Sequence, residues 1–315
     1  MKRFLLFSLM ILIIPAFSYA ASIGGAETQG KGKFSIGMDE EIVFDRDFKD
    51  ITLNDGRAYT GTITVIPGSD GVPIGLDVTG AKGDTKNKTN IDNMSRPMIK
   101  LSYGVLDNLD LFVRLGEANF KQKIKGEQVD TGTFVDPGSD NSGTYSGVIE
   151  NKGTFTGKSA LAWGLGAKGV MPLKNDWSLG MQAQYLTHRN SIKAKMTSKE
   201  TGTATVTAGT NEGETTSYES AEEEMNWNAK TTVQEWQIAP YIAKKIGNFI
   251  PYFGVKYSDM RGQYKDEDSK IKFKADDNFG VFLGTDFKLG DKFSLNLEGR
   301  FIDETAMSVG ATYRF

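Results

Sequence analysis

The sequence predicts an all-β fold: a transmembrane, antiparallel up-and-down β-barrel of about ten strands, with eight or twelve strands as alternatives. Three observations predict it. The chain begins with an export signal, apolar and polar residues alternate with a period of two from Phe34 to Phe315, and short turns alternate with long polar connections. No long segment has helical periodicity, so a membrane crossing by this chain must be made of strands.

The first 20 residues have the pattern of a secretory signal peptide. Lys2 and Arg3 precede an apolar run over 4–14, and small residues stand at Ser18 and Ala20. The run is too short to cross a bilayer as a helix, and its basic start and small-residue ending disfavour a buried core helix. We expect cleavage after Ala20 and export of residues 21–315 as one barrel domain.

The composition excludes one class of partner and one means of stabilisation. Without Lys2 and Arg3 the exported chain has 35 basic and 40 acidic residues, a net charge of about −5. Nucleic-acid binding needs a basic surface that displaces counterions from phosphate, so we expect no nucleic-acid partner. The chain has no cysteine, so hydrogen bonds and packing alone must hold the exported protein.

Ten segments have the alternation of strands. They lie near 33–46, 96–106, 109–121, 157–172, 176–195, 226–246, 249–264, 271–289, 292–303 and 305–315. Four very short connections contain Asn or Asp, often with Gly, as tight turns require: "LDNLD" at 106–110, "LKNDW" at 173–177, "IGNF" at 246–249 and "LGDKF" at 289–293.

Three long polar segments, near 47–95, 122–156 and 196–225, are predicted to be loops. Two shorter connections follow, at "KDEDS" and at Asp303-Glu304. Long and short connections alternate strictly, which places all tight turns at one end of the barrel, as in outer-membrane barrels with short periplasmic turns and long external loops. A possible hairpin at 50–65, turning at "NDG", is the source of the twelve-strand alternative.

The two faces of the strands differ in a way that favours a membrane barrel over a soluble sandwich. In the strand at 292–303, Phe293 and Leu297 share one face, and Glu298 and Arg300 share the other. The polar faces are rich in glycine, which suits the crowded inside of a narrow barrel. Five apolar-face aromatics beside the short turns are predicted to form a girdle at the periplasmic interface: Trp177, Phe249, Phe287, Phe293 and Phe315.

The last residues, "MSVGATYRF", carry a resemblance. They resemble the closing strand of the bacterial outer-membrane β-barrel protein superfamily, which characteristically ends in Phe with an aromatic residue two positions earlier. The resemblance implies location in the outer membrane of a Gram-negative cell. It also implies that Val309, Tyr313 and Phe315 form a signal for the outer-membrane assembly machinery. We expect this strand to pair with the segment around 33–45 and close the barrel.

Candidate sites for chemistry are weak. "GLGAKG" at 164–169 has dinucleotide-loop spacing, but the strand pattern continues through it, so we expect inward glycines and no cofactor. The single histidine, His188, is interpreted as a polar rim residue, with Ser191 on the opposite face of its strand. Acidic runs at 222–224 and 266–268 match no calcium loop and are interpreted as solvated charge. We expect no enzyme activity and no metal.

Charged residues on the polar face are predicted to form a network of salt bridges across the lumen. They are Asp39, Glu41, Lys100, Arg114, Lys168, Glu235, Lys256, Asp286, Lys288, Glu298, Arg300 and Arg314. The functional prediction is a monomeric, non-enzymatic barrel with a structural and surface-interaction role carried by its long loops, in contact with outer-membrane lipid and lipopolysaccharide and with an unidentified extracellular ligand. The alternative is a narrow porin-like channel for ions or small solutes.

Overall fold

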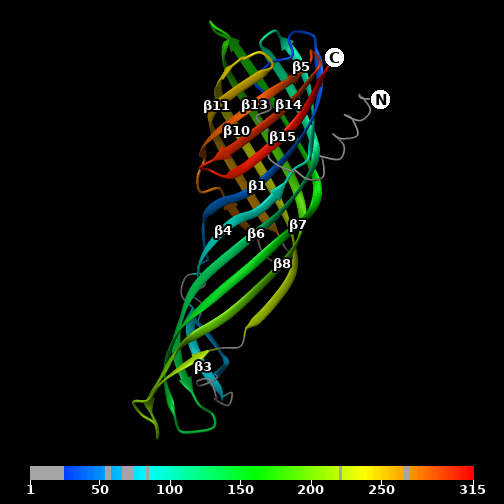
Figure 1. The fold of residues 1–315 in the computed structure, drawn as a ribbon. Helices are drawn as coiled ribbons and strands as arrows, with labels where there is room; N and C mark the ends of the chain where they lie inside the picture. Colours follow the sequence, from blue (N-terminus) through cyan, green and yellow to red (C-terminus); the bar gives the residue numbers. More distant parts are fainter. Residues whose placement is uncertain (1–24, 54–57, 66–73, 83–84, 220–221, 266–269) are drawn as a thin grey trace, which may run out of the picture.

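The computed structural model describes residues 25–53, 58–65, 74–82, 85–219, 222–265 and 270–315, and these form one antiparallel sheet (Figure 1). The predicted signal peptide lies outside the described residues. The strands are β1 (Phe34–Leu53), β2 (Ala58–Val65), β3 (Ile74–Lys82), β4 (Thr85–Ser95), β5 (Met98–Leu106), β6 (Leu109–Val135), β7 (Ser142–Pro172), β8 (Trp177–Ala208), β9 (Thr215–Glu219), β10 (Glu223–Lys244), β11 (Phe249–Lys265), β12 (Lys270–Lys274), β13 (Phe279–Leu289), β14 (Phe293–Phe301) and β15 (Thr305–Arg314). No helix in the described part of the chain is long and apolar enough to cross a membrane.

Ten of the described strands close into a ring at the end of the molecule that carries the short turns. Their order around the ring is β1, β5, β6, β7, β8, β10, β11, β13, β14 and β15. Closure is made by β1 and β15, which pair from Ser35 opposite Arg314 to Asp45 opposite Thr305. The predicted barrel and its predicted closing pair are confirmed, and the exposed edge that an open sheet would leave is removed.

The tight turns form where Asn, Asp and Gly tolerate left-handed backbone conformations. Asn175 and Asp176 have φ of 57° and 61°, while Gly247 and Gly290 have φ of 60° and 82°. These residues allow successive long strands to reverse within a few residues. The four tight turns, which join β5 to β6, β7 to β8, β10 to β11 and β13 to β14, all lie at one end of the ring.

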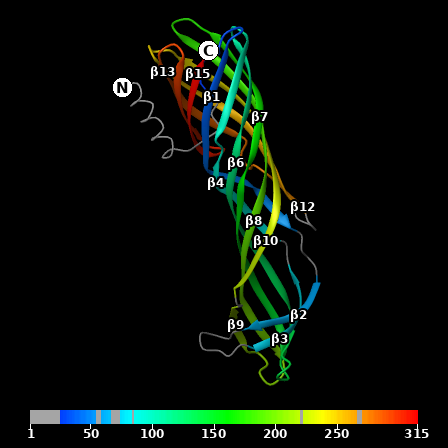
Figure 2. The same ribbon diagram turned by 90° about the vertical axis from the view of Figure 1, so that its right-hand side faces the viewer.

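The three segments predicted as loops are mostly strand, which corrects that prediction. Beyond the ring, β1, β6, β7, β8, β10 and β11 continue without interruption, and β2, β3, β4, β9 and β12 join them (Figures 1 and 2). We call this continuation the shaft. The predicted hairpin at 50–65 is also wrong, because in the described residues β1 pairs with β4 and β2 pairs with β3.

The apolar face of the strands changes sides where the ring meets the shaft. On β6, Leu111 and Leu115 face outward and Arg114 faces inward. Farther along the same strand Phe120 and Ile124 are buried inside, while Lys123 is exposed outside. On β6, odd-numbered side chains face outward in both the ring and the shaft, so the strand keeps its orientation. The apolar residues instead move from odd-numbered positions in the ring to even-numbered positions in the shaft. We call the ring portion with the outward apolar face the span.

Apolar side chains fill the inside of the shaft in two clusters. The lower cluster includes Val43, Phe48, Ile91, Met94, Phe120, Ile124, Phe155, Ile192, Val233, Met260, Tyr264 and Phe273. A second cluster lies at the far tip and contains Val78, Phe134, Tyr145, Ala204 and Tyr218. The shaft is thus held together by an apolar interior of the kind found in soluble domains.

Glycines inside the span make room for large rings. A Cβ at Gly180 would lie 2.1 Å from the ring of Tyr241, and one at Gly284 would lie 2.5 Å from the ring of Tyr252. Any side chain at these positions would collide with an aromatic ring that fills the lumen. The inward glycines therefore reflect a crowded barrel rather than an open one.

Candidate functional site

The twelve charged residues predicted for the lumen all lie on the inner face of the span or at its short-turn mouth. Ten are buried: Asp39, Glu41, Lys100, Arg114, Lys168, Glu235, Lys256, Asp286, Glu298 and Arg300. The other two, Lys288 and Arg314, are half-buried at the mouth and lie near Glu27, with the Lys288 Nζ 2.7 Å from its carboxylate. The span thus carries its charges inward.

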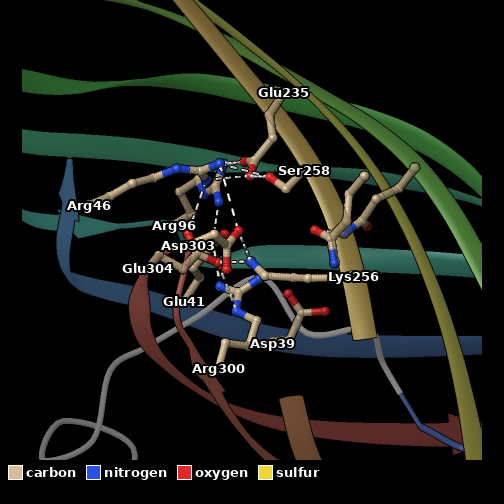
Figure 3. A network of polar contacts seen from close by, with 12 residues as sticks. Asp39, Glu41, Arg46, Arg96, Glu235, Lys256, Ser258, Arg300, Asp303 and Glu304 are labelled. Atoms are coloured by element: carbon tan, nitrogen blue, oxygen red, sulfur yellow. Dashed lines mark hydrogen bonds and ion pairs between the residues drawn. The ribbon is translucent and has the colours of Figure 1, made fainter. Parts of the chain in front are cut away.

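An ionic network crosses the lumen where the span meets the shaft (Figure 3). It joins four cations to four carboxylates: Arg46, Arg96, Lys256 and Arg300 with Glu41, Glu235, Asp303 and Glu304. Each of these side chains is at most 4% exposed. The charges cancel within the network, as burial away from water requires.

Two arginines tie opposite walls of the barrel together. Arg46 on β1 reaches Glu235 on β10 at 2.8 Å, and Glu304, in the connection from β14 to β15, at 3.0 Å. Arg96 binds Glu41 and also reaches Glu235 at 2.7 Å. Because each guanidinium presents several donors in one plane, a single arginine can bridge two carboxylates from different strands.

Four members of the network were not predicted. Arg96 lies between β4 and β5, directly before Pro97, where no alternation marks its direction. Arg46 lies where the alternation inverts. Asp303 and Glu304 were predicted as an external connection, but both side chains are fully buried in the network. The preceding residue, Ile302, has φ of 85°, a backbone turn that aims the two carboxyl groups inward.

His188 is not the polar rim residue predicted from the sequence. Its ring is 3% exposed inside the barrel, 2.5 Å from the Asn190 side-chain oxygen and beside Phe120. Ser191 is exposed on the outer face, as predicted. The histidine and this hydroxyl therefore lie on opposite sides of the barrel wall.

The short-turn mouth is crossed by the segment that precedes β1, residues 25–33. The backbone N–H of Ala26 donates to Asp286 on β13 at 2.6 Å, and that of Gln29 donates to Asp110 on β6 at 3.0 Å. Strands β6 and β13 stand on opposite sides of the ten-strand ring, so the segment spans the lumen. The cavity beneath it, beside Lys100, is only about 30 Å³.

Three layers thus fill the lumen from the mouth to the shaft. The first is the 25–33 segment with a cluster of rings that includes Tyr241, Tyr252 and Phe282. The second is the ionic network, and the third is the apolar interior of the shaft. A void of about 10 Å³ lies beside His188 in that third layer.

Two girdles of aromatic side chains bound the outward apolar belt. The lower girdle is the predicted one and lies beside the short turns. Trp177, Phe249, Phe287 and Phe315 are exposed there, and Phe293 is half-buried. The upper girdle consists of Trp163, Tyr185, Trp236, Tyr257 and Phe279. The two girdles are eight residues apart on β8, β11 and β13, about 26 Å along a strand, or about 20 Å along the barrel axis at a 40° tilt.

Ion pairs lie on the outer surface of the shaft, beyond the upper girdle. Hydrogen bonds from Lys123, Lys195 and Arg261 lower the pKa values of Asp92, Glu224 and Asp259 respectively.

The acidic run at 222–224 is exposed, and the run at 266–268 lies outside the described residues. Within the described ranges, no group of three or more histidine and acidic residues is arranged to hold a metal ion. The "GLGAKG" sequence is part of β7, as its strand pattern predicted.

Comparisons with known proteins identify no family for this chain. No protein-family model matches the chain, and no curated protein matches it. Solved structures similar to it include the outer membrane protease OmpT from Escherichia coli, at 13% identity and a TM-score of 0.41 over 89% of this chain and 97% of that one. The translocator domain of autotransporter NalP from Neisseria meningitidis has 9% identity and a TM-score of 0.28, covering 92% of this chain and 91% of its own. The Pseudomonas putida toluene transporter TodX has 10% identity and a TM-score of 0.25, covering 95% and 94%.

Proposed function

We propose that this chain is a non-enzymatic barrel of the bacterial outer membrane whose lumen is sealed and whose shaft is an extracellular surface for interaction. The single observation that carries the proposal is the filled lumen. A buried network of ion pairs lies between the apolar interior of the shaft and a mouth crossed by residues 25–33.

The orientation follows from the ends of the barrel. The short turns and Phe315 lie at the lower girdle, where a chain delivered from the periplasm would leave them. The shaft then extends from the cell surface. Along β7, sixteen residues separate Lys158 from Ser142, about 50 Å of strand beyond the membrane.

A strand-built shaft differs from flexible loops as an interaction surface. Its outer positions carry Lys, Thr, Ser and Glu on a paired backbone, so their spacing is fixed before any partner arrives. Such preorganisation reduces the entropy lost on binding. A role in surface contact or in envelope structure therefore suits the shaft better than a role in transport through the lumen.

Conductance in planar bilayers tests the sealed lumen. Purified full-length protein is expected to give no discrete steps, whereas the alternative, a narrow channel for ions or small solutes, requires them. A variant lacking residues 25–33 is the matched comparison, because it opens the mouth and leaves the network in place. Discrete conductance from the unaltered protein would contradict the proposal.

Shortening the shaft tests the surface role. Residues 58–82, 128–149 and 201–218 are replaced by short turns, which leaves the pairs Leu53–Thr85 and Gly126–Asn151 in register. Cells expressing the shortened barrel are expected to lose autoaggregation or adherence to plastic and epithelial monolayers, while heat-modifiable gel mobility remains that of a folded barrel. Unchanged behaviour in all three assays would contradict the interaction role.

A further inference from the structure

A small cavity lies inside the barrel at the short-turn mouth, beneath the 25–33 segment, and we call it the mouth chamber. Inward side chains of β1, β5, β7, β13, β14 and β15 form its wall, and Gly25, Glu27 and Gln29 of the segment cover it. Its volume is about 30 Å³. Because one water-sized atom needs about 10–15 Å³ by this measure, the chamber has room for one or two such atoms.

The strand register places hydrogen-bond donors in two successive rows on one wall of the mouth chamber. The first row is Lys100, Gly37, Thr312 and Ser294 on β5, β1, β15 and β14, and the second is Ser102, Ser35 and Arg314 on β5, β1 and β15. Neither row contains a carboxylate on these strands. Lysine and arginine side chains only donate, and each hydroxyl can turn to donate as well. This wall therefore suits a ligand that accepts hydrogen bonds.

Lys100 is a buried cation without a carboxylate in contact. It is 8% exposed, and in the described part of the chain it forms no ion pair; its Nζ lies 4.4 Å from the centroid of the Phe112 ring. Other buried cations of the lumen do contact carboxylates: Arg46, Arg96, Arg114, Lys256 and Arg300. Burial of a charge is costly unless an opposite charge lies beside it.

The hydroxyl groups around Lys100 are also available. Among the residues that the structure describes, no side-chain hydrogen bond engages the hydroxyls of the chamber wall, which belong to Ser35, Ser102, Ser294 and Thr312. The three serines are each at most 6% exposed. Buried donors without an acceptor lower stability, so an acceptor inside the chamber would be stabilising.

The three carboxylates that line the mouth chamber are bound to other donors. These donors are Arg114 for Asp39, the Ala26 N–H and the Asn296 amide for Asp286, and Lys288 for Glu27. The distances are 2.6 Å from Ala26, 2.8 Å from Asn296 and 2.7 Å from Lys288. None of the three carboxylates is in contact with Lys100.

Two neighbouring cations add to the positive charge beside Lys100. Arg114 stands directly opposite Lys100 on β6, and like charges in such a cross-strand pair repel each other. Lys168 on β7 is buried and lines the same chamber. Between Lys100 and Thr312 the wall carries only Gly37, where a Cβ would lie 3.1 Å from the Thr312 hydroxyl. The register thus leaves space for a ligand between the ammonium group and the hydroxyls.

We propose that the mouth chamber binds one monatomic, monovalent anion of the size of chloride, held by the Lys100 ammonium group and the surrounding hydroxyls. Hydrogen bonds from a charged donor to an anion are among the strongest in proteins, and here they replace the hydration shell of the ion. Sulfate and phosphate have five heavy atoms each and exceed the volume of the chamber. The inference uses only the inside of the barrel, so it goes beyond the proposed surface role and does not depend on it.

Anion-dependent stability tests the site. Purified full-length protein in detergent is heated in sodium chloride or in sodium gluconate at equal ionic strength, and heat-modifiable gel mobility gives the midpoint of unfolding. An anion that binds only the folded state raises this midpoint as its concentration rises. We expect a higher midpoint in chloride than in gluconate.

Three variants assign that difference to the chamber. Lys100→Met removes the ammonium group and keeps a side chain of similar length, and it is expected to abolish the difference between chloride and gluconate. Ser102→Ala removes one hydroxyl and is expected to weaken the apparent affinity for chloride about fivefold. Lys245→Met is the matched control, because Lys245 is exposed at the same mouth and outside the chamber. It is expected to keep the full difference.

Bromide provides a direct readout. Crystals grown in sodium bromide are expected to give one anomalous diffraction peak beside Lys100, and crystals of Lys100→Met none at this place. Equal midpoints in chloride and gluconate, an undiminished difference in Lys100→Met, or no bromide peak in the chamber would each overturn the proposal and show that the chamber holds water only. Conductance and adherence are measured separately, so either proposal can fail alone.

Discussion

The span and the shaft are built from the same strands and have opposite insides. In the span the inner face holds the ionic network and the outer face is apolar; in the shaft the inner face is apolar and the outer face holds lysines. The strands run through without changing which side chains face outward. In the proposed membrane placement, lipid outside the span and water outside the shaft account for the composition of both faces.

Different interactions stabilise the interiors of the shaft and the span. Dispersion and the hydrophobic effect act in the shaft, where rings such as Phe48 and Phe273 pack edge to face with centroids 4.9 Å apart. In the span, buried charges depend on each other, so the loss of one member leaves its partners desolvated and unpaired. The span should therefore be the more fragile half toward removal of a single polar group.

The largest expected effect is in the ionic network. Replacing Arg46 with Ala leaves Glu235 and Glu304 without one of their cations and should lower the free energy of unfolding by about 3–5 kcal/mol. Urea unfolding in detergent, followed by tryptophan fluorescence, measures it. Arg261→Ala is the control, because its pair with Asp259 is on the surface and should contribute about 0–1 kcal/mol. Equal losses in the two variants would show that the network does not hold the span.

Placing the same lysine on the outer face of both halves tests the contrast directly. Val113 and Val129 are both outward on β6 and both 54% exposed. Val113→Lys puts a charge in the middle of the apolar belt and should cost about 2–4 kcal/mol. Val129→Lys puts it in water and should change stability by about 0.5 kcal/mol or less. The measurement is unfolding in lipid vesicles, and similar costs for the two variants would contradict the assigned boundary.

Two inward glycines, one in each half, differ in the space beside them. Gly180→Ala in the span drives a methyl group into Tyr241 and should cost about 1–3 kcal/mol. Gly153→Ala in the shaft meets its nearest atom, on Phe155, at 3.4 Å and should stabilise by about 0.4–1 kcal/mol. Thermal transitions from heat-modifiable gel mobility rank the two. A destabilised Gly153→Ala variant would mean that a methyl group does not fit beside Phe155 either.

The difference between the halves also explains what the sequence could and could not predict. The span was predictable, because Leu111 and Arg114 on opposite faces of β6 give strong alternation. The shaft was predicted as loops, since its inner face includes small residues such as Gly153 and Ala194 and its outer face is Thr- and Lys-rich, which weakens the alternation. Because the apolar residues also change face within one strand, no single period-two pattern extends from the span into the shaft.

Strand periodicity predicted some members of the ionic network and not others. Glu235 and Arg300 lie within strands whose facing is clear, so their inward direction follows from the period of two. Glu304 lies in a connection, where no period applies and an Asp-Glu pair is most simply interpreted as a solvated turn. Its burial depends on cations from β1, β11 and β14, which only the closed barrel brings together.

The smallest expected effect is a pH dependence confined to the tip of the shaft. The Tyr218 hydroxyl donates to Glu200 at 2.5 Å, and burial together with this carboxylate raises the pKa of Tyr218 above its usual range. Because the folded state keeps the phenol neutral, its contribution to stability is complete below about pH 10, the usual tyrosine pKa, and is lost as pH rises above it. Subtilisin cleavage of the tip should therefore accelerate above that pH, while the span stays intact on gels. In Tyr218→Phe the acceleration should disappear. If the acceleration persists in Tyr218→Phe, ionisation of another group destabilises the tip. The interiors of the span and the shaft would then differ less in their response to ionisation than their composition implies.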